Sequence, residues 1–194
     1  ASRKFVPVDL GKIFNDDAQL LKLRNLPSGE TAMGGVPTRL FPSRAVRGDV
    51  RPTVIPVGAK AASLIFLHTQ YCAPEDLPKL RLGHRITGWM NGRKTAVYRV
   101  CYSDGRKIPV YSRNTINNGN VYPVRGFTAS EIGMRYIPDA RFVRDDNDGK
   151  DGLLYQYEWV NPRPEVPIER IEFTSMGDLV PVTPYLLALT LREP

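Results

Sequence analysis

Two stretches of the sequence collect aromatic, arginine and asparagine side chains. One, residues 69–93, carries Trp89 in the glycine-rich segment TGWMNG; the other, residues 112–120, is rich in asparagine. An aromatic ring packs against the apolar C–H face of a sugar, while amides and guanidinium groups hydrogen-bond its hydroxyls. We therefore predict a carbohydrate-binding site composed of Trp89, Arg113, Asn117, Asn114, Tyr71, Arg85, Asn91, Tyr111, Asn118, Asn120 and Tyr122.

Strand direction predicts that both stretches are loops at one end of the fold. An apolar strand at 63–68 leads into the first loop, and the chain returns along a strand at 95–102. The tight Asp104-Gly105 turn then lies at the opposite end, so the strand at 107–111 leads back to the second loop. Two alternatives remain open. In the first, Trp89 fills the bottom of the core while the asparagines only make turns. In the second, the ligand binds elsewhere, at the loops of the opposite end or on the sheet face around Arg99.

Two acidic stretches are candidate calcium sites, because calcium prefers several oxygen ligands on a flexible loop. Residues 145–152 offer Asp146 and Asp148, but their spacing differs from that of an EF-hand, and a solvated turn is the alternative. Near the N-terminus, Asp16 and Asp17 offer a second site, and the alternative there is the start of a short helix. We expect no required cofactor, with a structural calcium ion as the only candidate.

The sequence offers few candidates for catalysis. Neither a G-x-S-x-G nor an H-E-x-x-H motif occurs, and only two histidines are present. His68 ends the most apolar strand, which favours a hydrogen-bonded core histidine over a general base. A pair of carboxylates could still act on a glycosidic bond, but spacing alone brings no two acidic residues together. We therefore expect a protein that is not an enzyme.

The net charge of +7 suggests a polyanionic partner. Nucleic acid is disfavoured, because the basic residues are scattered singly and no nucleic-acid motif is present. A membrane is also disfavoured, since no apolar run approaches the roughly 20 residues of a membrane span. An anionic polysaccharide suits the charge, and the alternative is a surface charge that serves solubility alone. The two cysteines, Cys72 and Cys101, either pair or stay free and buried.

Frequent turns and short alternating segments predict an all-β fold, an antiparallel β-sandwich in one domain spanning residues 1–194. Glycine and proline supply 16 and 17 residues, and helix periodicity is nearly absent apart from a short turn at 15–21. Further strands are expected at 153–160, 168–173 and 185–191. The predicted core comprises Leu64, Ile65, Phe66, Leu67, Tyr98, Val100, Ile171, Phe173, Leu187 and Leu189.

Several blocks of sequence resemble β-sandwich modules that bacterial carbohydrate-active enzymes carry. These blocks are VIPVGAKAASLIFLHT (54–69), KTAVYRVCYSDGRKIPVY (94–111) and YQYEWVNPRPEVPIERIEF (155–173). The first and last strands, in FVPVDLGKIFND (5–16), GGVPTRLF (34–41) and PVTPYLLALTL (181–191), are also similar, and all blocks follow the order of that family. The resemblance implies a galactose-binding-like jelly roll. Where the family often has an aspartate and two tryptophans, this chain has residues 112–120, which implies a different specificity.

The resemblance also implies a non-catalytic carbohydrate-binding module that is secreted, periplasmic or on the cell surface. Such a module binds a polysaccharide or oligosaccharide and thereby raises the local concentration of substrate for a linked or partner glycoside hydrolase. Two alternatives remain: a structural accessory domain without a glycan ligand, and a small glycan-degrading enzyme.

Overall fold

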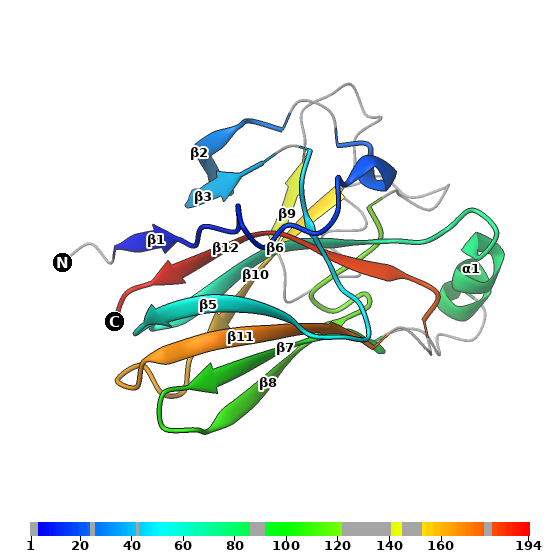
Figure 1. The fold of residues 1–194 in the computed structure, drawn as a ribbon. Helices are drawn as coiled ribbons and strands as arrows, with labels where there is room; N and C mark the ends of the chain where they lie inside the picture. Colours follow the sequence, from blue (N-terminus) through cyan, green and yellow to red (C-terminus); the bar gives the residue numbers. More distant parts are fainter. Residues whose placement is uncertain are drawn as a thin grey trace.

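Two antiparallel sheets packed face to face confirm the predicted all-β sandwich (Figure 1). The structure is a computed structural model that describes residues 4–23, 26–41, 43–85, 92–121, 141–144, 153–176 and 180–194. The six-stranded sheet has the order β1-β12-β6-β10-β9, with β4 also paired to β12, and the four-stranded sheet has the order β5-β11-β7-β8. The strands are β1 (Phe5–Pro7), β4 (Val46–Arg47), β5 (Thr53–Ala59), β6 (Ser63–Tyr71), β7 (Lys94–Tyr102), β8 (Lys107–Arg113), β9 (Arg141–Arg144), β10 (Leu153–Val160), β11 (Ile168–Ser175) and β12 (Thr183–Arg192).

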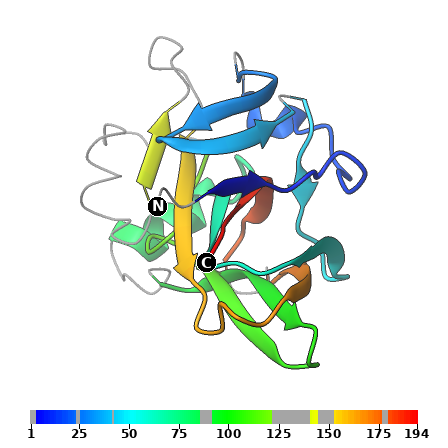
Figure 2. The same cartoon turned by 90° about the vertical axis from the view of Figure 1, so that its left-hand side faces the viewer.

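A third layer covers the outer side of the six-stranded sheet. It consists of the hairpin of β2 (Gly29–Met33) and β3 (Val36–Leu40), together with the short 3-10 helix η1 (Gln19–Leu21). Figure 2 shows this hairpin at the top and the four-stranded sheet at the bottom, with β1 and β12 between them. The six-stranded sheet is therefore the middle of three layers.

The middle position of β6 explains its continuous apolar sequence. Phe66 faces the four-stranded sheet and stacks on Tyr98 with 4.3 Å between the ring centroids. The next residue, Leu67, faces the third layer and packs in a cluster with Leu21 and Leu40. Both faces of β6 are thus removed from water, as expected for a strand without polar alternation.

Hydrophobic patterning predicted the long strands closely. The strand at 153–160 is found with the predicted bounds, whereas β6 and β8 continue two to three residues further towards the loops. The hairpin between β7 and β8 turns at Gly105, whose φ of 84° is a left-handed conformation that glycine adopts without strain. All ten predicted core residues are buried: Leu64, Ile65, Phe66, Leu67, Tyr98, Val100, Ile171, Phe173, Leu187 and Leu189.

The sequence analysis did not predict the α-helix α1 (Leu77–Arg85). It is only nine residues long, and Pro78 lies in its first turn, where a missing N–H costs no helical hydrogen bond. Leu80 is buried in a small cluster with Cys72 and two valines that precede β12. The few apolar residues of this short helix do not form a recognisable helical period, so its stability depends on tertiary packing.

Both cysteines are free and buried, so the disulfide alternative is not realised. Cys72 lies just beyond β6, and Cys101 lies on β7, three residues before the Asp104-Gly105 turn. Burial raises the pKa of the Cys72 thiol to about 11, and the nearby carboxylates of Asp76 and Glu75 raise it further. The Cys72 thiol is therefore protonated and unreactive near neutral pH.

We expect Phe66→Ala to lower the free energy of unfolding by about 3–5 kcal/mol, because the fully buried ring leaves a cavity between the two sheets. Urea unfolding followed by tryptophan fluorescence measures this change. The matched control is Val160→Ala on the adjacent strand, where the side chain is 67% exposed and a change of about 0.5 kcal/mol or less is expected. A loss below about 1 kcal/mol for Phe66→Ala would contradict the assignment.

Candidate functional site

The two predicted loops lie at the same end of the sandwich, as strand direction predicted. The Gly92 N–H donates to the Asn114 carbonyl over 2.7 Å, and the Asn114 N–H donates to the Arg93 carbonyl over 2.9 Å. The Cys72 N–H reaches the side-chain oxygen of Asn120, 3.1 Å away. We call this end, formed by residues 72–85, 92–93 and 113–121, the loop end, and the opposite end at residues 103–106 the turn end (Figure 1).

The asparagines of the second loop build the loop itself. The Asn117 amide accepts from the Arg113 N–H over 2.7 Å and donates to the Tyr111 carbonyl over 2.9 Å. The Asn118 amide donates to the Ser112 hydroxyl, and its oxygen accepts from the next N–H of the chain. Asn114, Asn117 and Asn118 are all at most 3% exposed. The amides of Asn117 and Asn118 thus bind groups of their own loop, and the Asn114 oxygen accepts from the Gln70 amide over 2.6 Å. Ligand binding by these residues stays a prediction.

His68 connects this loop to the core. Its Nε2 lies 2.8 Å from the carbonyl oxygen of Asn117, which can only accept, so Nε2 carries the proton. The unprotonated Nδ1 then accepts from the Tyr98 hydroxyl on β7, 3.0 Å away. Burial lowers the pKa of His68 to about 4, although the hydrogen bond to Asn117 opposes this shift. The histidine is therefore a neutral core residue, and the expectation for it is confirmed.

The outward face of the four-stranded sheet offers accessible side chains. Strand register places Val97 beside Tyr111 in one cross-strand row, and Glu172 beside Arg99 in the next row towards the turn end. Lys107 follows one row further on. Because side chains alternate along a strand, these residues share the face that points away from the core.

Tyr111 and two cations form a cluster where this face meets the loop end. The Lys94 ammonium lies 3.8 Å from the centroid of the Tyr111 ring, and the Arg113 guanidinium lies 5.9 Å from it. Tyr111 and Lys94 are half-buried, whereas Arg113 is exposed. The cluster thus combines an aromatic ring with two positive charges, a set that suits a sugar carrying an acid group.

A second group of cations surrounds Glu172 nearer the turn end. Arg170 donates to one oxygen of this carboxylate through Nε over 3.2 Å and through a terminal nitrogen over 3.1 Å. Arg99 and Lys107 lie 3.5 and 3.6 Å from its oxygens. We call the surface that carries Lys94, Arg99, Lys107, Arg113 and Arg170 the basic face; Glu172 is the carboxylate set among them.

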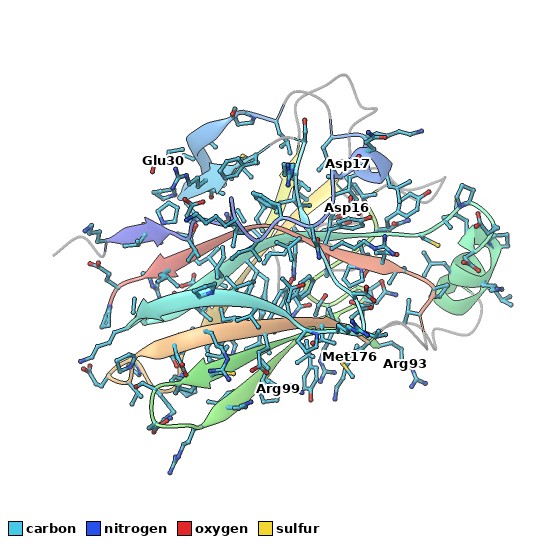
Figure 3. All side chains as sticks on the ribbon, in the orientation of Figure 1. Asp16, Asp17, Glu30, Arg93, Arg99 and Met176 are labelled. Carbon is cyan, nitrogen blue, oxygen red and sulfur yellow. The ribbon has the colours of Figure 1, made fainter. Side chains whose placement is uncertain are left out.

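The acidic residues near the N-terminus that were predicted to bind calcium lie away from the basic face (Figure 3). Arg99 lies low on the four-stranded sheet, whereas Asp16 and Asp17 lie beside η1 on the opposite side of the molecule. Each of these two carboxylates accepts the N–H two residues ahead, over 2.7 and 3.2 Å, as in a turn that begins a helix. The described residues contain no group of three or more candidate metal ligands. Calcium binding at this place stays a prediction.

The remaining predicted residues divide into two sets. Tyr71 ends β6 and is half-buried at the loop end, like Asn120, and Arg85 is the last residue of α1. The others lie outside the described residues: Trp89, Asn91, Tyr122, Asp146 and Asp148. Of the predicted ligands, the structure therefore brings Tyr111 and Arg113 together on an accessible surface.

The sequence analysis missed Lys94, Lys107 and Arg170 as parts of a site, although it named the surface around Arg99 as an alternative. A usable signal was present, because the even and odd positions of a strand face opposite sides. Arg99 alternates with the buried Tyr98 and Val100 in β7. What alternation could not supply was the pairing of β7 with β8 and β11, which brings these cations together.

The sequence motifs behind the resemblance meet at the turn end and in the core. Asn161 accepts from the Tyr102 hydroxyl over 2.6 Å and donates to the Ala61 carbonyl over 2.7 Å, so it joins three separate motifs. Arg163 forms a two-pronged ion pair with Asp104 and lies over the Tyr102 ring at 4.8 Å. The Arg163 hydrogen bond lowers the pKa of Asp104 to about 2. These motif residues hold the scaffold together.

Comparisons with known proteins leave the family open: no family model matches the sequence, and no curated protein matches it. Among the described residues, no helix has both the length and the apolar character needed to cross a membrane.

We expect the free energy of unfolding to fall as the pH drops from about 6.5 to about 4. In this range His68 is protonated in the unfolded chain and stays neutral in the folded protein. The resulting loss in the free energy of unfolding is up to about 3 kcal/mol. Urea titrations at several pH values measure the slope. His68→Gln should remove this part of the slope; an unchanged slope in that variant would contradict the buried neutral histidine.

Asn161→Ala should lower the free energy of unfolding by about 2–4 kcal/mol, because it leaves the Tyr102 hydroxyl and the Ala61 carbonyl buried without their partner. Thermal and urea unfolding report the loss. Asp104→Asn at the same end is the control, and we expect a smaller loss because that ion pair is solvent-accessible. Equal losses of unfolding free energy in both variants would contradict the role of Asn161 as the buried partner of Tyr102 and Ala61.

Proposed function

We propose that this protein is a non-catalytic carbohydrate-binding module whose ligand is an acidic polysaccharide. The observation that carries the proposal is the cluster of Tyr111, Lys94 and Arg113 on an accessible sheet face beside the loop end. A binding module of this kind holds a linked or partner glycoside hydrolase near its polymer and raises the effective substrate concentration. Its place of action is outside the cytoplasm, in the periplasm or at the cell surface, where such polymers are found.

The chemistry of the cluster favours an acidic sugar over a neutral one. Arg113 is exposed, and its planar guanidinium can donate two hydrogen bonds to a carboxylate or a sulfate. Lys94 adds a second positive charge on the same ring. The Tyr111 ring offers apolar area to C–H groups of the sugar, and its hydroxyl offers a hydrogen bond. A neutral glycan would use the ring and leave both cations unpaired.

Binding to nucleic acid is less well supported on this face. Sheet surfaces that bind single strands use several aromatic side chains, each of which stacks on a base. Tyr111 is the aromatic residue that the described part of the basic face presents.

The scattered carboxylates also favour a protein that is not an enzyme. Glu158 is bound to Ser63 and Arg192 on the six-stranded sheet, and Glu165 lies beside Lys60.

A structural accessory domain without a ligand is the second candidate. The specific observation in its favour is that Asn161, Arg163 and Tyr102, which belong to the motifs of the resemblance, all serve the scaffold. Such a domain would brace a neighbouring catalytic domain, and its basic face would contact that domain.

Affinity electrophoresis in gels with polygalacturonate, a sulfated galactan or a neutral galactan tests the proposal. The protein should be retarded by an acidic polymer at low salt, with little retardation by the neutral one and no new reducing ends. Tyr111→Ala and Arg113→Gln should each weaken binding by about tenfold, the size of one charge-assisted or aromatic contact. Lys60→Gln, which removes a charge at the turn end, should leave the affinity unchanged.

Absence of retardation in every gel would favour the bracing domain. Released sugar would show instead that the protein is an enzyme. Binding to acidic polymers that survives 1 M salt unchanged would contradict the ionic basis, because accessible charges are screened over about 3 Å at that concentration.

A further inference from the structure

The cations at the two ends of the basic face lie far enough apart to need a long ligand. Arg113 and Lys107 are the ends of β8, and the chain between them is extended. At about 3.3 Å per residue, these ends are separated by roughly 20 Å. On the neighbouring strand β7, Lys94 pairs with Arg113, and Arg99 pairs with Pro109, between the two ends. A single acidic sugar that contacts Arg113 therefore cannot also contact Lys107.

Glu172 holds its three cations unequally. Arg170 makes two hydrogen bonds to one carboxylate oxygen, over 3.1 and 3.2 Å, whereas the oxygens lie 3.5 Å from Arg99 and 3.6 Å from Lys107. Strong charged hydrogen bonds are nearer 2.8 Å, so the latter two contacts are loose. The Glu172 side chain is 13% exposed, whereas those of Arg99 and Lys107 are 43% and 48% exposed. The two loosely held cations thus project beyond the carboxylate, where an external anion can meet them.

The Glu172 carboxylate keeps its negative charge at neutral pH. Burial alone would raise its pKa, but the hydrogen bond from Arg170, the contact with Cys101 and the charge of Lys107 lower it below the usual value. The fixed charge therefore screens Arg99 and Lys107 from any approaching anion.

We propose that an extended acidic polysaccharide lies along β7 and β8, contacts both cation groups, and displaces Glu172 as the counter-ion of Arg99 and Lys107. This inference rests on the proposed function and adds the length, the direction and the charge spacing of the ligand. Glu172 is then a residue that sets specificity. A polymer with regularly repeated acid groups can replace Glu172 as the ionic partner of Arg99 and Lys107. A neutral or sparsely charged chain cannot.

Two substitutions test the role of Glu172. Glu172→Gln should bind polygalacturonate roughly threefold to tenfold more tightly than the parent, with a steeper dependence on salt, because two cations lose their internal partner. The matched control is Glu169→Gln on the same strand, which removes an equal charge; among the described residues, Glu169 forms an ion pair with Arg170. We expect its affinity to stay within about twofold. Unchanged or weaker binding by a folded Glu172→Gln would overturn the proposal.

Ligand length provides a test that does not depend on the stability of Glu172→Gln. Isothermal titration compares a long galacturonan with a digalacturonate, which is too short to contact both Arg113 and Lys107. Lys107→Gln should weaken binding of the long chain by about threefold to tenfold and leave the short one, bound at the Tyr111 cluster, unchanged. Equal effects on both ligands, or none on either, would overturn the extended binding mode.

These outcomes are distinct from those of the proposed function. If Tyr111→Ala and Arg113→Gln lose affinity while Arg99→Gln, Lys107→Gln and Glu172→Gln do not, the binding module stands and the extended mode is wrong. If no variant changes binding, both are wrong. A single-stranded oligonucleotide is the competitor of another class. Equal displacement by it, at the same salt and total charge, would overturn the choice of a polysaccharide.

Discussion

The burial of β6 on both faces is the constraint from which the rest of the structure follows. A strand between two layers has no solvent to satisfy its polar groups, so every polar side chain on it needs a partner inside the protein. His68, Thr69 and Gln70 at its C-terminal end are all fully buried. The loop after β8 supplies partners for two of them, since Asn117 and Asn114 accept from His68 and Gln70. The Thr69 hydroxyl donates to the Leu153 carbonyl on β10 over 2.8 Å. The core thereby holds this loop in place.

That requirement connects the interior to the proposed binding surface. Asn117 receives the His68 hydrogen bond on its carbonyl and uses its amide to hold the backbone of Arg113 and Tyr111. The last residues of β8 are consequently fixed, and their side chains project to the outside. The asparagine-rich sequence, which suggested sugar contacts, has a different use here, because short amides satisfy backbone groups in tight turns. In the proposed function, the contacts with a ligand are made by the residues that those turns position.

Charge shows the same dependence on tertiary structure. The basic residues are scattered singly along the sequence, and this spacing argued against a nucleic-acid partner. Pairing of β7 with β8 and β11 nevertheless brings Lys94, Arg99, Lys107, Arg113 and Arg170 to one face around Glu172. Strand neighbours in a sheet lie about 4.8 Å apart even when they are dozens of residues apart in sequence. A local count of charges in the sequence therefore misses a patch assembled across strands.

The sequence by itself determined the fold class, the long strands, the ten core positions and the arrangement of the two loops at one end. Each of these depends on local chemistry: the alternation of side chains in a strand, the aspartate and glycine of a tight turn, and the cost of leaving apolar groups in water. His68 was also assigned correctly, because a histidine at the end of an apolar strand is surrounded by core. Only the tertiary structure decided the helix α1, the free state of Cys72 and Cys101, the burial of the loop asparagines and the gathering of the basic face. These features depend on which distant segments become neighbours, and the order of residues along one strand carries no information about the strand beside it.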